Sequence, residues 1–311
     1  MPEPIAKETL TLHIAEMGLG AWAWGDRAMW NYGHGYDETD IEHAFRTSLA
    51  GGVNLVDTAE VYGAGRSERF LGQFLKTTTT PVLVATKFLP YPWRLHRGAL
   101  MRSLDRSLER LGLEQVYLYQ IHWPFPPMPV EFWVEELAKA VQSGMTRTAG
   151  VSNFSKTQMQ RADTILSKYG IPLASNQVEY HLLERTVEKN GLLDLCKEMG
   201  VRLIAYSPLA KGLLTGKYTL ESPPPGLRSR QPAGRMKPLP ALIALMTEIG
   251  QGHGDKTPGQ VALNWLICKG ALPIPGAKNA KQAGQNAGAI GWRLATEEMK
   301  ALDDASDQFA K

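Results

Sequence analysis

The sequence is poor in features that mark whole classes of protein. Its 311 residues include only two cysteines, Cys196 and Cys268, too few for a disulfide framework and not in a spacing used by zinc sites. Lys and Arg number 34 against 31 acidic residues, and no basic block forms a nucleic-acid-binding segment. These absences predict a reducing compartment, no metal site and no nucleic-acid partner.

Long apolar segments are also missing. Residues 1–9 include acidic side chains and no apolar stretch of signal-peptide type, and no later apolar run reaches the roughly 18 residues of a membrane span. We therefore expect a cytoplasmic protein that does not associate with membranes. Hydrophobic residues make up 43% of the chain, which supports a packed core. We expect a single domain over residues 1–311.

Short β-type runs recur along the chain, each followed by a helix-type segment. The runs end near Leu19, Asp57, Lys87, His122, Ser152, Gln177, Ser207 and Gly276. Between the second run and the seventh, successive ends lie roughly 25 to 35 residues apart, the length of one βα unit. Eight such units predict a (β/α)8 TIM barrel. The Pro-rich segment 222–240, after the seventh run, predicts a long loop that forms a mobile lid over the barrel mouth.

A doubly wound, three-layer sheet would show the same alternation of strands and helices. Dinucleotide-binding sheets of that kind usually carry G-x-G-x-x-G after a strand, and none of these runs is followed by that motif. The missing motif favours the barrel. Between the runs, the segment GALMRSLDRSLERLGL predicts an amphipathic helix with Leu100, Leu104, Leu108 and Leu111 on one face.

Polar residues stand at the ends of these runs, which in a barrel form the mouth where active sites lie. Taken singly, Asp57 is explained as a helix N-cap, His122 as a core histidine and Tyr62 as a packing residue. Taken together they indicate a catalytic site, because burying the charges of Asp57 and Lys87 is costly unless the two are paired. Beside Tyr62 and His122, such a pair suggests a tuned proton donor.

At these residues the chain resembles the aldo-keto reductases. Seven motifs carry the resemblance nearly from end to end: NLVDTAEVYGAGRSERFLG, ATKF, QIHWP, GVSNFS, NQVEYHLL, IAYSPLAKGLLTGKY and IPGAKNAKQAGQN. The form SPLAKGLLTGKY looks more like the bacterial, plant and potassium-channel β-subunit branches than the aldose reductase branch. The resemblance implies NADPH-dependent reduction of aldehydes or ketones by a catalytic tetrad of Asp57, Tyr62, Lys87 and His122.

The implied mechanism gives each tetrad residue one task. Hydride transfer to a carbonyl carbon leaves an alkoxide that needs a proton, and Tyr62 is the expected acid. Lys87 is expected to lower the pKa of the Tyr62 phenol, and Asp57 to keep Lys87 charged and oriented. His122, as a neutral imidazole, would orient the substrate carbonyl. This chemistry requires no metal.

The resemblance also implies where NADP(H) binds. Residues for the nicotinamide are expected to be Ser152, Asn153, Gln177 and Tyr206, the last stacking on its ring. Residues for the pyrophosphate are expected to be Ser207, Leu209, Gly212 and Lys217. Residues for the adenosine phosphate are expected to be Gly276, Lys278, Gln282, Gln285 and Asn286.

This last segment departs from the family pattern. Many members have an Arg four positions after a basic residue, where this chain has Gln282 after Lys278. Lys278 can offer a point charge to the 2′-phosphate of NADPH, but the bidentate recognition that an Arg provides is lost. A modest preference for NADPH over NADH follows. The alternative for Lys278 is a solvated surface lysine.

Aromatic residues on the mouth loops predict a broad aromatic pocket: Trp22, Trp24, Trp93, Trp123 and Phe125. For about half of them, packing elsewhere is an open alternative. Aromatic and short aliphatic aldehydes, pyridoxal included, are the expected substrates of a monomer or weak homo-oligomer. The alternative function is an NADP(H)-binding regulatory or sensor subunit with little turnover, against which the intact tetrad argues.

Overall fold

The computed structural model describes residues 14–219, 222–224 and 237–309. Eight strands form one sheet in sequence order, and each pairs in parallel with the next. The strands are β1 (Leu19–Gly20), β2 (Leu55–Asp57), β3 (Leu83–Phe88), β4 (Val116–Ile121), β5 (Thr146–Ser152), β6 (Leu173–Glu179), β7 (Arg202–Tyr206) and β8 (Leu272–Pro273). This is the topology of a (β/α)8 barrel, so the predicted fold class is confirmed.

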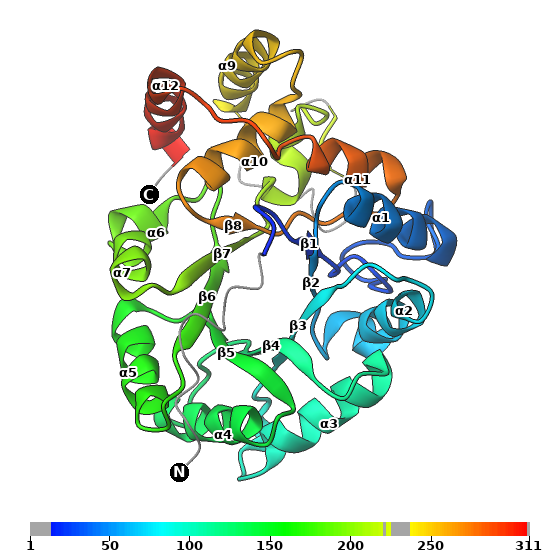
Figure 1. Cartoon of the computed structure of the whole chain (residues 1–311). Coiled ribbons are helices and arrows are strands. Elements are labelled where there is room, and N and C mark those ends of the chain that lie inside the picture. The colour runs from blue at the N-terminus through cyan, green and yellow to red at the C-terminus, as the bar shows by residue number, and fades with distance from the viewer. Residues whose placement is uncertain (1–13, 220–221, 225–236, 310–311) are drawn as a thin grey trace.

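The barrel closes between β1 and β8 through backbone contacts (Figure 1). The Gly18 N–H donates to the Pro273 carbonyl at 2.9 Å, and the Gly20 N–H donates to the Pro275 carbonyl at 3.0 Å. The two segments approach so closely that a Cβ at Gly20 would lie 2.7 Å from the Ile274 carbonyl oxygen. Glycine is therefore required where the ring of strands is sealed.

Helices surround the strands on the outside of the ring (Figure 1). They are α1 (Glu38–Ala50), α2 (Arg66–Leu75), α3 (Ala99–Leu111), α4 (Val130–Gln142), α5 (Lys156–Ser167), α6 (Thr186–Lys189), α7 (Leu192–Met199), α9 (Leu239–Gly252), α10 (Pro258–Cys268), α11 (Ala280–Ala287) and α12 (Thr296–Ser306). Short 3₁₀ turns are η2 (Tyr62–Gly65), η3 (Pro92–Arg94), η4 (Ala210–Thr215) and η6 (Asp307–Phe309).

Helix α3 shows how the sequence pattern produces this outer layer. Its leucines at positions 100, 104, 108 and 111 are buried, as predicted from their helical spacing. The helix ends at Gly112, which adopts a left-handed φ of 67° and caps the last turn. The apolar stripe therefore packs toward the strands and the polar face points outward.

The inside of the barrel is filled rather than hollow. A separate interior cluster of buried apolar side chains plugs it: Leu55, Ala85, Leu118, Ile204, Leu272 and Ile274. A second, larger core lies between the strands and the helices. Because the interior is packed, ligands have access only to the ends of the strands.

The predicted loop 222–240 falls largely on residues 225–236, which lie outside the described residues. Its final part is not a loop, because α9 begins at Leu239. Pro240 is compatible with this start, since the first turn of a helix leaves its N–H groups without intrahelical partners. The prediction of a loop as far as residue 240 was therefore wrong at this end.

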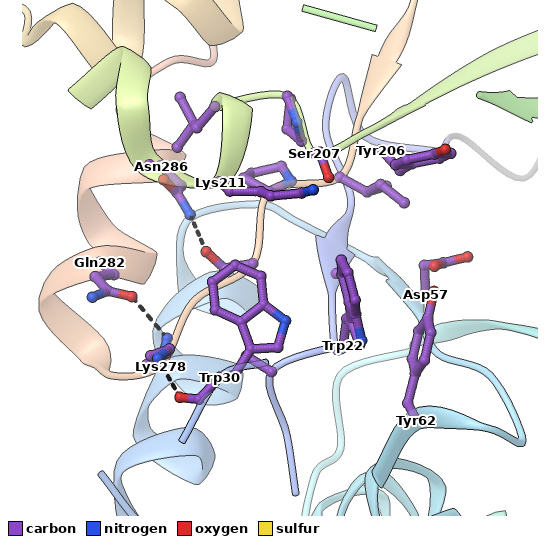
Figure 2. A pocket seen from close by; sticks show the side chains of 18 of the residues that line it. Trp22, Trp30, Asp57, Tyr62, Tyr206, Ser207, Lys211, Lys278, Gln282 and Asn286 are labelled. Atoms are coloured by element: carbon purple, nitrogen blue, oxygen red, sulfur yellow. Dashed lines mark hydrogen bonds between the residues drawn. The ribbon is translucent and has the colours of Figure 1, made fainter. Parts of the chain in front are cut away.

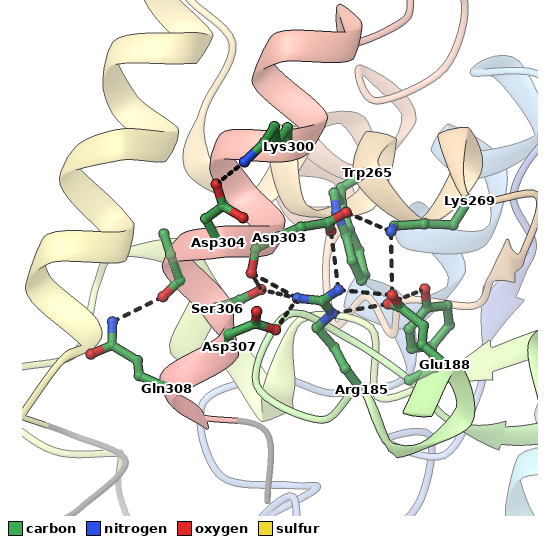
Figure 3. Close-up of polar contacts among 12 residues, drawn as sticks. Arg185, Glu188, Trp265, Lys269, Lys300, Asp303, Asp304, Ser306, Asp307 and Gln308 are labelled. Atoms are coloured by element: carbon green, nitrogen blue, oxygen red, sulfur yellow. Dashed lines mark hydrogen bonds and ion pairs between the residues drawn. The ribbon is translucent and has the colours of Figure 1, made fainter. Parts of the chain in front are cut away.

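A network of charged side chains joins the helix after β6 to the C-terminal helix α12 (Figure 3). Arg185 binds Glu188 at 2.8 Å, the Asp303 carbonyl at 2.7 Å and the Asp307 carboxylate at 3.0 Å. Lys269, on α10, donates to the Asp303 carboxylate at 2.7 Å. The Arg185 side chain is only 9% exposed, so its hydrogen bonds compensate for its desolvation.

Replacing Arg185 by leucine should lower the free energy of unfolding by about 2 kcal/mol, because hydrogen bonds to charged groups contribute roughly 1.5–3 kcal/mol. Urea unfolding would measure the change. Arg97→Leu is the control, since the Arg97–Glu135 pair is exposed and screened by solvent, so its loss should change the free energy of unfolding much less. Equal losses for both variants would contradict a stabilising role for the Arg185 network.

Candidate active site

A cavity of about 530 Å³ opens at the carboxyl ends of the strands. Every residue predicted for the site, except Lys87, lines it: Asp57, Tyr62, His122, Ser152, Asn153, Gln177, Tyr206, Ser207, Leu209, Gly212, Lys217, Gly276, Lys278, Gln282, Gln285 and Asn286. Lys87 is fully buried beside Asp57. The barrel thus gathers at one mouth side chains that are far apart in the sequence.

Three oxygen atoms surround the Lys87 ammonium. Its Nζ donates to Asp57 Oδ1 at 2.5 Å, to the Thr58 carbonyl at 2.8 Å and to the Tyr62 hydroxyl at 3.3 Å. The Asp57 side chain is 2% exposed, so a buried cation faces a buried anion. The ammonium therefore links a charge-balanced pair to the phenol of Tyr62.

The turn after β2 places Tyr62 within reach of Lys87. Tyr62 begins η2, and Gly63 follows it with a left-handed φ of 56°. A Cβ at Gly63 would lie 2.7 Å from the Gly25 carbonyl oxygen, so a larger residue would push this turn away from the neighbouring loop. The VYG sequence therefore provides both the phenol and the turn that positions it.

The second oxygen of Asp57 accepts hydrogen bonds from two glutamines. Gln177 Nε2 lies 2.8 Å from Asp57 Oδ2, and Gln120 Nε2 lies 3.3 Å from it. Gln177 was predicted only as a nicotinamide-binding residue, and Gln120 was not predicted at all. The sequence feature that could have identified Gln120 is its place in the QIHWP motif. In the sheet, Gln120 on β4 pairs with Lys87 on β3.

Opposing influences set the pKa values of this cluster. Burial raises the pKa of the Tyr62 phenol, and although the Lys87 ammonium lowers it, the net pKa lies above its ordinary value. The predicted effect of Lys87 on this pKa is confirmed in direction, but desolvation of the phenol is the larger effect. Burial lowers the pKa of Lys87, but Asp57 and Tyr62 raise it above its usual value. Both groups hold their protons at neutral pH.

His122 follows β4 and faces the same phenol. Its ring lies edge-on to that of Tyr62, with centroids 5.9 Å apart. Burial, and secondarily the Lys87 ammonium, lower the pKa of His122 to about 3. Its buried Nδ1 neither donates nor accepts a hydrogen bond among the described residues. The imidazole is therefore neutral at physiological pH.

The depressed pKa of His122 has a consequence for stability. Because the unfolded chain binds a proton at an ordinary pKa of about 6.5 and the folded chain does not, stability is full above pH 6.5 and falls as the pH drops toward 3. Lowering the pH from 7.5 to 5 should reduce the free energy of unfolding by about 2 kcal/mol through His122 alone.

Urea unfolding at these two pH values would check the expectation. The His122→Gln variant should lose about 2 kcal/mol less than the wild type on acidification. His34→Gln, which changes an exposed histidine, serves as the control and should follow the wild type. A His122→Gln variant with the full wild-type pH dependence would show that His122 titrates normally in the folded protein.

Asn153, Ser152 and Tyr206 form an ordered wall of the cavity. Asn153 has a left-handed φ of 62°, and its Nδ2 donates to the His122 carbonyl at 3.1 Å and to Ser152 Oγ at 3.0 Å. The Tyr206 hydroxyl donates to Asn153 Oδ1 at 3.1 Å. These contacts fix one amide group, one hydroxyl and one aromatic ring beside the Asp57, Lys87 and Tyr62 cluster.

The chain after β7 curls through several left-handed residues. Ser207, Ala210, Lys211 and Gly212 have φ values of 52°, 49°, 56° and 100°. Consecutive residues of this kind can turn backbone N–H groups toward an anion. Lys211 lines the cavity together with the predicted Lys217, although the sequence analysis missed it within SPLAKG.

The aromatic wall differs from the prediction. Trp22 and Trp123 line the cavity, and so does Trp30, which was missed. Trp24 does not, because a turn from Ala21 to Trp24 directs its ring into the core against Phe45 and Phe74.

Two other predicted aromatics also lie outside the cavity lining. Trp93 and Phe125 are 72% and 43% exposed, and neither is among the lining residues. They stack on loop neighbours instead, Trp93 on Tyr91 and Phe125 on Trp123. The prediction that these two residues line the pocket was therefore wrong, because both rings lie on the surface.

Glu60 is another residue that the sequence analysis missed. Its buried carboxylate accepts the Leu89 N–H at 2.9 Å and two contacts from Arg94 Nη1, at 2.7 and 2.8 Å. It thereby ties the Tyr62 turn to the loop after β3. The sequence feature that could have identified Glu60 is its position in VDTAEVYG, between Asp57 and Tyr62.

Residues 16–307 match the model of the Aldo/keto reductase family. The chain belongs to this family. It is 39% identical over 313 residues to the chloroplastic pyridoxal reductase of Arabidopsis thaliana, covering 96% of this chain and 85% of that protein. It is 31% identical to the L-glyceraldehyde 3-phosphate reductase of Escherichia coli K12, covering 94% of this chain and 89% of the relative. This aldo/keto reductase is therefore an oxidoreductase.

Solved structures agree with this assignment. The glycerol dehydrogenase of Gluconobacter oxydans superimposes with a TM-score of 0.82 at 32% identity, over 94% of this chain and 91% of that one. An aldo-keto reductase of Klebsiella pneumoniae, solved in complex with NADPH, superimposes with a TM-score of 0.73 at 29% identity, over 93% and 90%.

Two features are absent from the described part of this aldo/keto reductase. Within residues 14–219, 222–224 and 237–309, no helix is long and apolar enough to cross a membrane. Within the same residues, no group of three or more His, Cys, Asp or Glu side chains is placed to hold a metal ion.

Proposed function

We propose that this chain reduces aldehydes and ketones to alcohols with NADPH, and that Tyr62 is the general acid. One observation carries the proposal. The Tyr62 hydroxyl and the His122 ring share the cavity wall, while the Lys87 ammonium, paired with Asp57, lies 3.3 Å from that hydroxyl. A neutral donor, a neutral ring and a buried cation at one point are suited to protonating a developing alkoxide.

The cavity residues fit the coenzyme. Three lysines line one end of the cavity, at positions 211, 217 and 278, and suit the charges of a pyrophosphate and a 2′-phosphate. At the other end, Ser152 and Asn153 present amide-binding groups beside the flat ring of Tyr206. When bound, NADPH supplies the hydride. The proposed NADPH-binding residues are those predicted from the sequence, with Lys211 added.

Tyr62 supplies the proton. Burial keeps its phenol protonated, and the Lys87 ammonium stabilises the phenolate that remains after the proton has moved. Asp57 compensates the charge of Lys87, and both glutamines hold Asp57 in place. A positioned acid of this kind contributes roughly 10²- to 10⁴-fold to the rate.

His122 orients the substrate. Because its imidazole is neutral and its Nδ1 accepts no hydrogen bond from the described residues, Nε2–H is the form that can donate to a substrate carbonyl. This donation would direct the carbonyl oxygen toward the Tyr62 hydroxyl. Fixing that angle before the reaction removes part of its entropic cost.

The walls suggest planar aldehydes as substrates. Indole rings at Trp22, Trp30 and Trp123 line the cavity, and Trp22 stacks on Tyr62. Flat aromatic surfaces bind flat rings through burial and stacking. The similarity to a protein named pyridoxal reductase supports the same choice, and pyridoxal is the substrate we propose to test first.

The test is the loss of reduced-nicotinamide absorbance when NADPH is mixed with pyridoxal, benzaldehyde, propanal or L-glyceraldehyde 3-phosphate. We expect turnover with the two aromatic aldehydes at lower KM than with the two aliphatic ones. Bound NADPH without turnover on any carbonyl would support the regulatory alternative instead. Equal KM values for all four compounds would contradict the aromatic preference.

Three further proposals concern the whole chain. We propose one domain over residues 1–311, a monomer or weak homo-oligomer, and a cytoplasmic location. The two thiols support a reducing compartment, because both Cys196 and Cys268 are free in the structure. Sedimentation of the purified protein tests the oligomeric state.

A further inference from the structure

The loop between β1 and α1, residues 21–37, separates the phosphate end of the cavity from the catalytic end. Figure 2 shows two of its indoles, Trp30 and Trp22, between Lys278 on one side and Tyr62 on the other. Trp30 and Trp22 meet edge to face at 5.6 Å, and Trp22 stacks on Tyr62 at 6.1 Å. The two indoles therefore form a continuous aromatic row from Lys278 to the proposed acid.

Lys278 is attached to this loop rather than directed into solvent. Its Nζ donates to the Trp30 carbonyl at 2.8 Å. The same ammonium lies 4.3 Å from the ring centre of Tyr36 and 5.2 Å from that of Trp30, which are cation–π distances. The alternative of a solvated surface lysine was therefore wrong, because its charge is enclosed by the β1–α1 loop.

The base of the loop has other anchors. Trp24 Nε1 donates to the Ala277 carbonyl at 3.0 Å, and the Tyr36 hydroxyl donates to the Ala23 carbonyl at 2.7 Å. At Trp30, near the tip, Lys278 donates from the barrel, and the neighbouring Tyr32 packs on Phe70 of α2. Removing the ammonium would therefore take one support from Trp30 while the anchors at the base stay in place.

We propose that Lys278 couples the adenosine phosphate of the coenzyme to the aromatic wall of the substrate pocket, by holding Trp30 and, through it, Trp22 against Tyr62. This inference rests on the proposed function, in which Lys278 binds the 2′-phosphate. Lys278 is thus a positioning residue for the substrate as well as a ligand for NADPH.

The physical argument depends on the shared ammonium. A phosphate is a stronger hydrogen-bond acceptor than a peptide carbonyl. A 2′-phosphate beside Lys278 therefore competes with the Trp30 carbonyl for the N–H donors of the ammonium. Any shift of the ammonium changes the position of Trp30, and the edge-to-face contact transmits the change to Trp22. Linkage makes the effect reciprocal, so a ligand that orders Trp22 also changes the affinity for the phosphate.

This proposal differs from a simple phosphate contact in its effect on reactions with NADH. NADH has no 2′-phosphate, so a lysine that only bound phosphate would not alter them. If Lys278 also holds Trp30, the Lys278→Met variant should raise the KM for pyridoxal about fivefold or more with saturating NADH, a change in the usual range of coupling between sites. The change in kcat should be smaller, because the tetrad is untouched.

The matched control is Lys281→Met, which removes an exposed lysine from α11. It should leave the KM for pyridoxal unchanged with either coenzyme. A double variant with Trp30→Ala tests the route: if Lys278 acts through Trp30, Lys278→Met should add little to the KM of Trp30→Ala. Additive effects, or an unchanged KM for Lys278→Met with NADH, would overturn the proposal.

A second measurement does not depend on turnover. The chain has eight tryptophans, so fluorotryptophan labelling gives a small set of ¹⁹F signals that Trp→Phe variants can assign. Lys278→Met should shift the signals of Trp30 and Trp22 but not those of Trp133 and Trp265, which are buried elsewhere. Adenosine 2′,5′-bisphosphate should shift Trp30 in the wild type, and adenosine 5′-monophosphate should not.

The two proposals fail in different ways. A wild-type protein that reduces no carbonyl, yet shows these ¹⁹F shifts, would refute the proposed function and leave the coupling intact. Turnover of pyridoxal with Trp30 and Trp22 signals that respond to neither Lys278→Met nor the bisphosphate would refute the coupling alone.

Discussion

The Tyr62→Phe variant should lose aldehyde reduction almost completely while it still binds NADPH. The substitution removes one oxygen atom, the atom that lies 3.3 Å from Lys87 Nζ and that we propose as the proton source. Because the phenol donates its proton only during the reaction, kcat should fall on the order of 10²-fold or more. The ring remains, so its stacking on Trp22 is preserved.

Steady-state kinetics with pyridoxal and a fluorescence titration with NADPH would measure the two quantities separately. Tyr169→Phe is the matched control, because Tyr169 is 40% exposed and does not line the cavity. It should retain full activity. Turnover by Tyr62→Phe within a few-fold of wild type would remove Tyr62 from the role of acid.

The Lys87→Met variant should be both inactive and unstable. Removing one partner of a buried pair leaves the other as an uncompensated charge, which typically costs about 3–5 kcal/mol. Here the remaining charge is Asp57, whose side chain is 2% exposed and keeps only its two glutamine contacts. We expect a loss of unfolding free energy in that range, measured by urea denaturation.

Two comparisons separate charge burial from other effects. The double variant Lys87→Met, Asp57→Asn removes the uncompensated charge and should recover part of the stability, though not the activity. Lys300→Met breaks an exposed, solvent-screened pair with Asp304 and should change the free energy of unfolding far less than Lys87→Met. A Lys87→Met protein as stable as wild type would contradict the energetic role assigned to the buried pair of Lys87 and Asp57.

The sequence by itself determined the fold class and the composition of the site. Strand ends at Asp57 and Ser152, and the end of β3 to within one residue at Lys87, could be read from local apolar runs, because parallel strands buried on both faces are short and continuous. Their ordered spacing then implied a barrel, and a barrel brings the carboxyl ends of its strands together. The family motifs supplied the same tetrad residues, of which the structure places three at one cavity and Lys87 behind them, buried beside Asp57.

Only the tertiary structure decided how these side chains meet. The direction of an indole depends on turns, so Trp24 enters the core while Trp22, two positions earlier, lines the cavity. The net pKa of Tyr62 depends on desolvation by the whole mouth, which outweighs the nearby cation. The attachment of Lys278 to Trp30 joins residues at opposite ends of the chain, and no local pattern encodes a contact between segments that only barrel closure brings together.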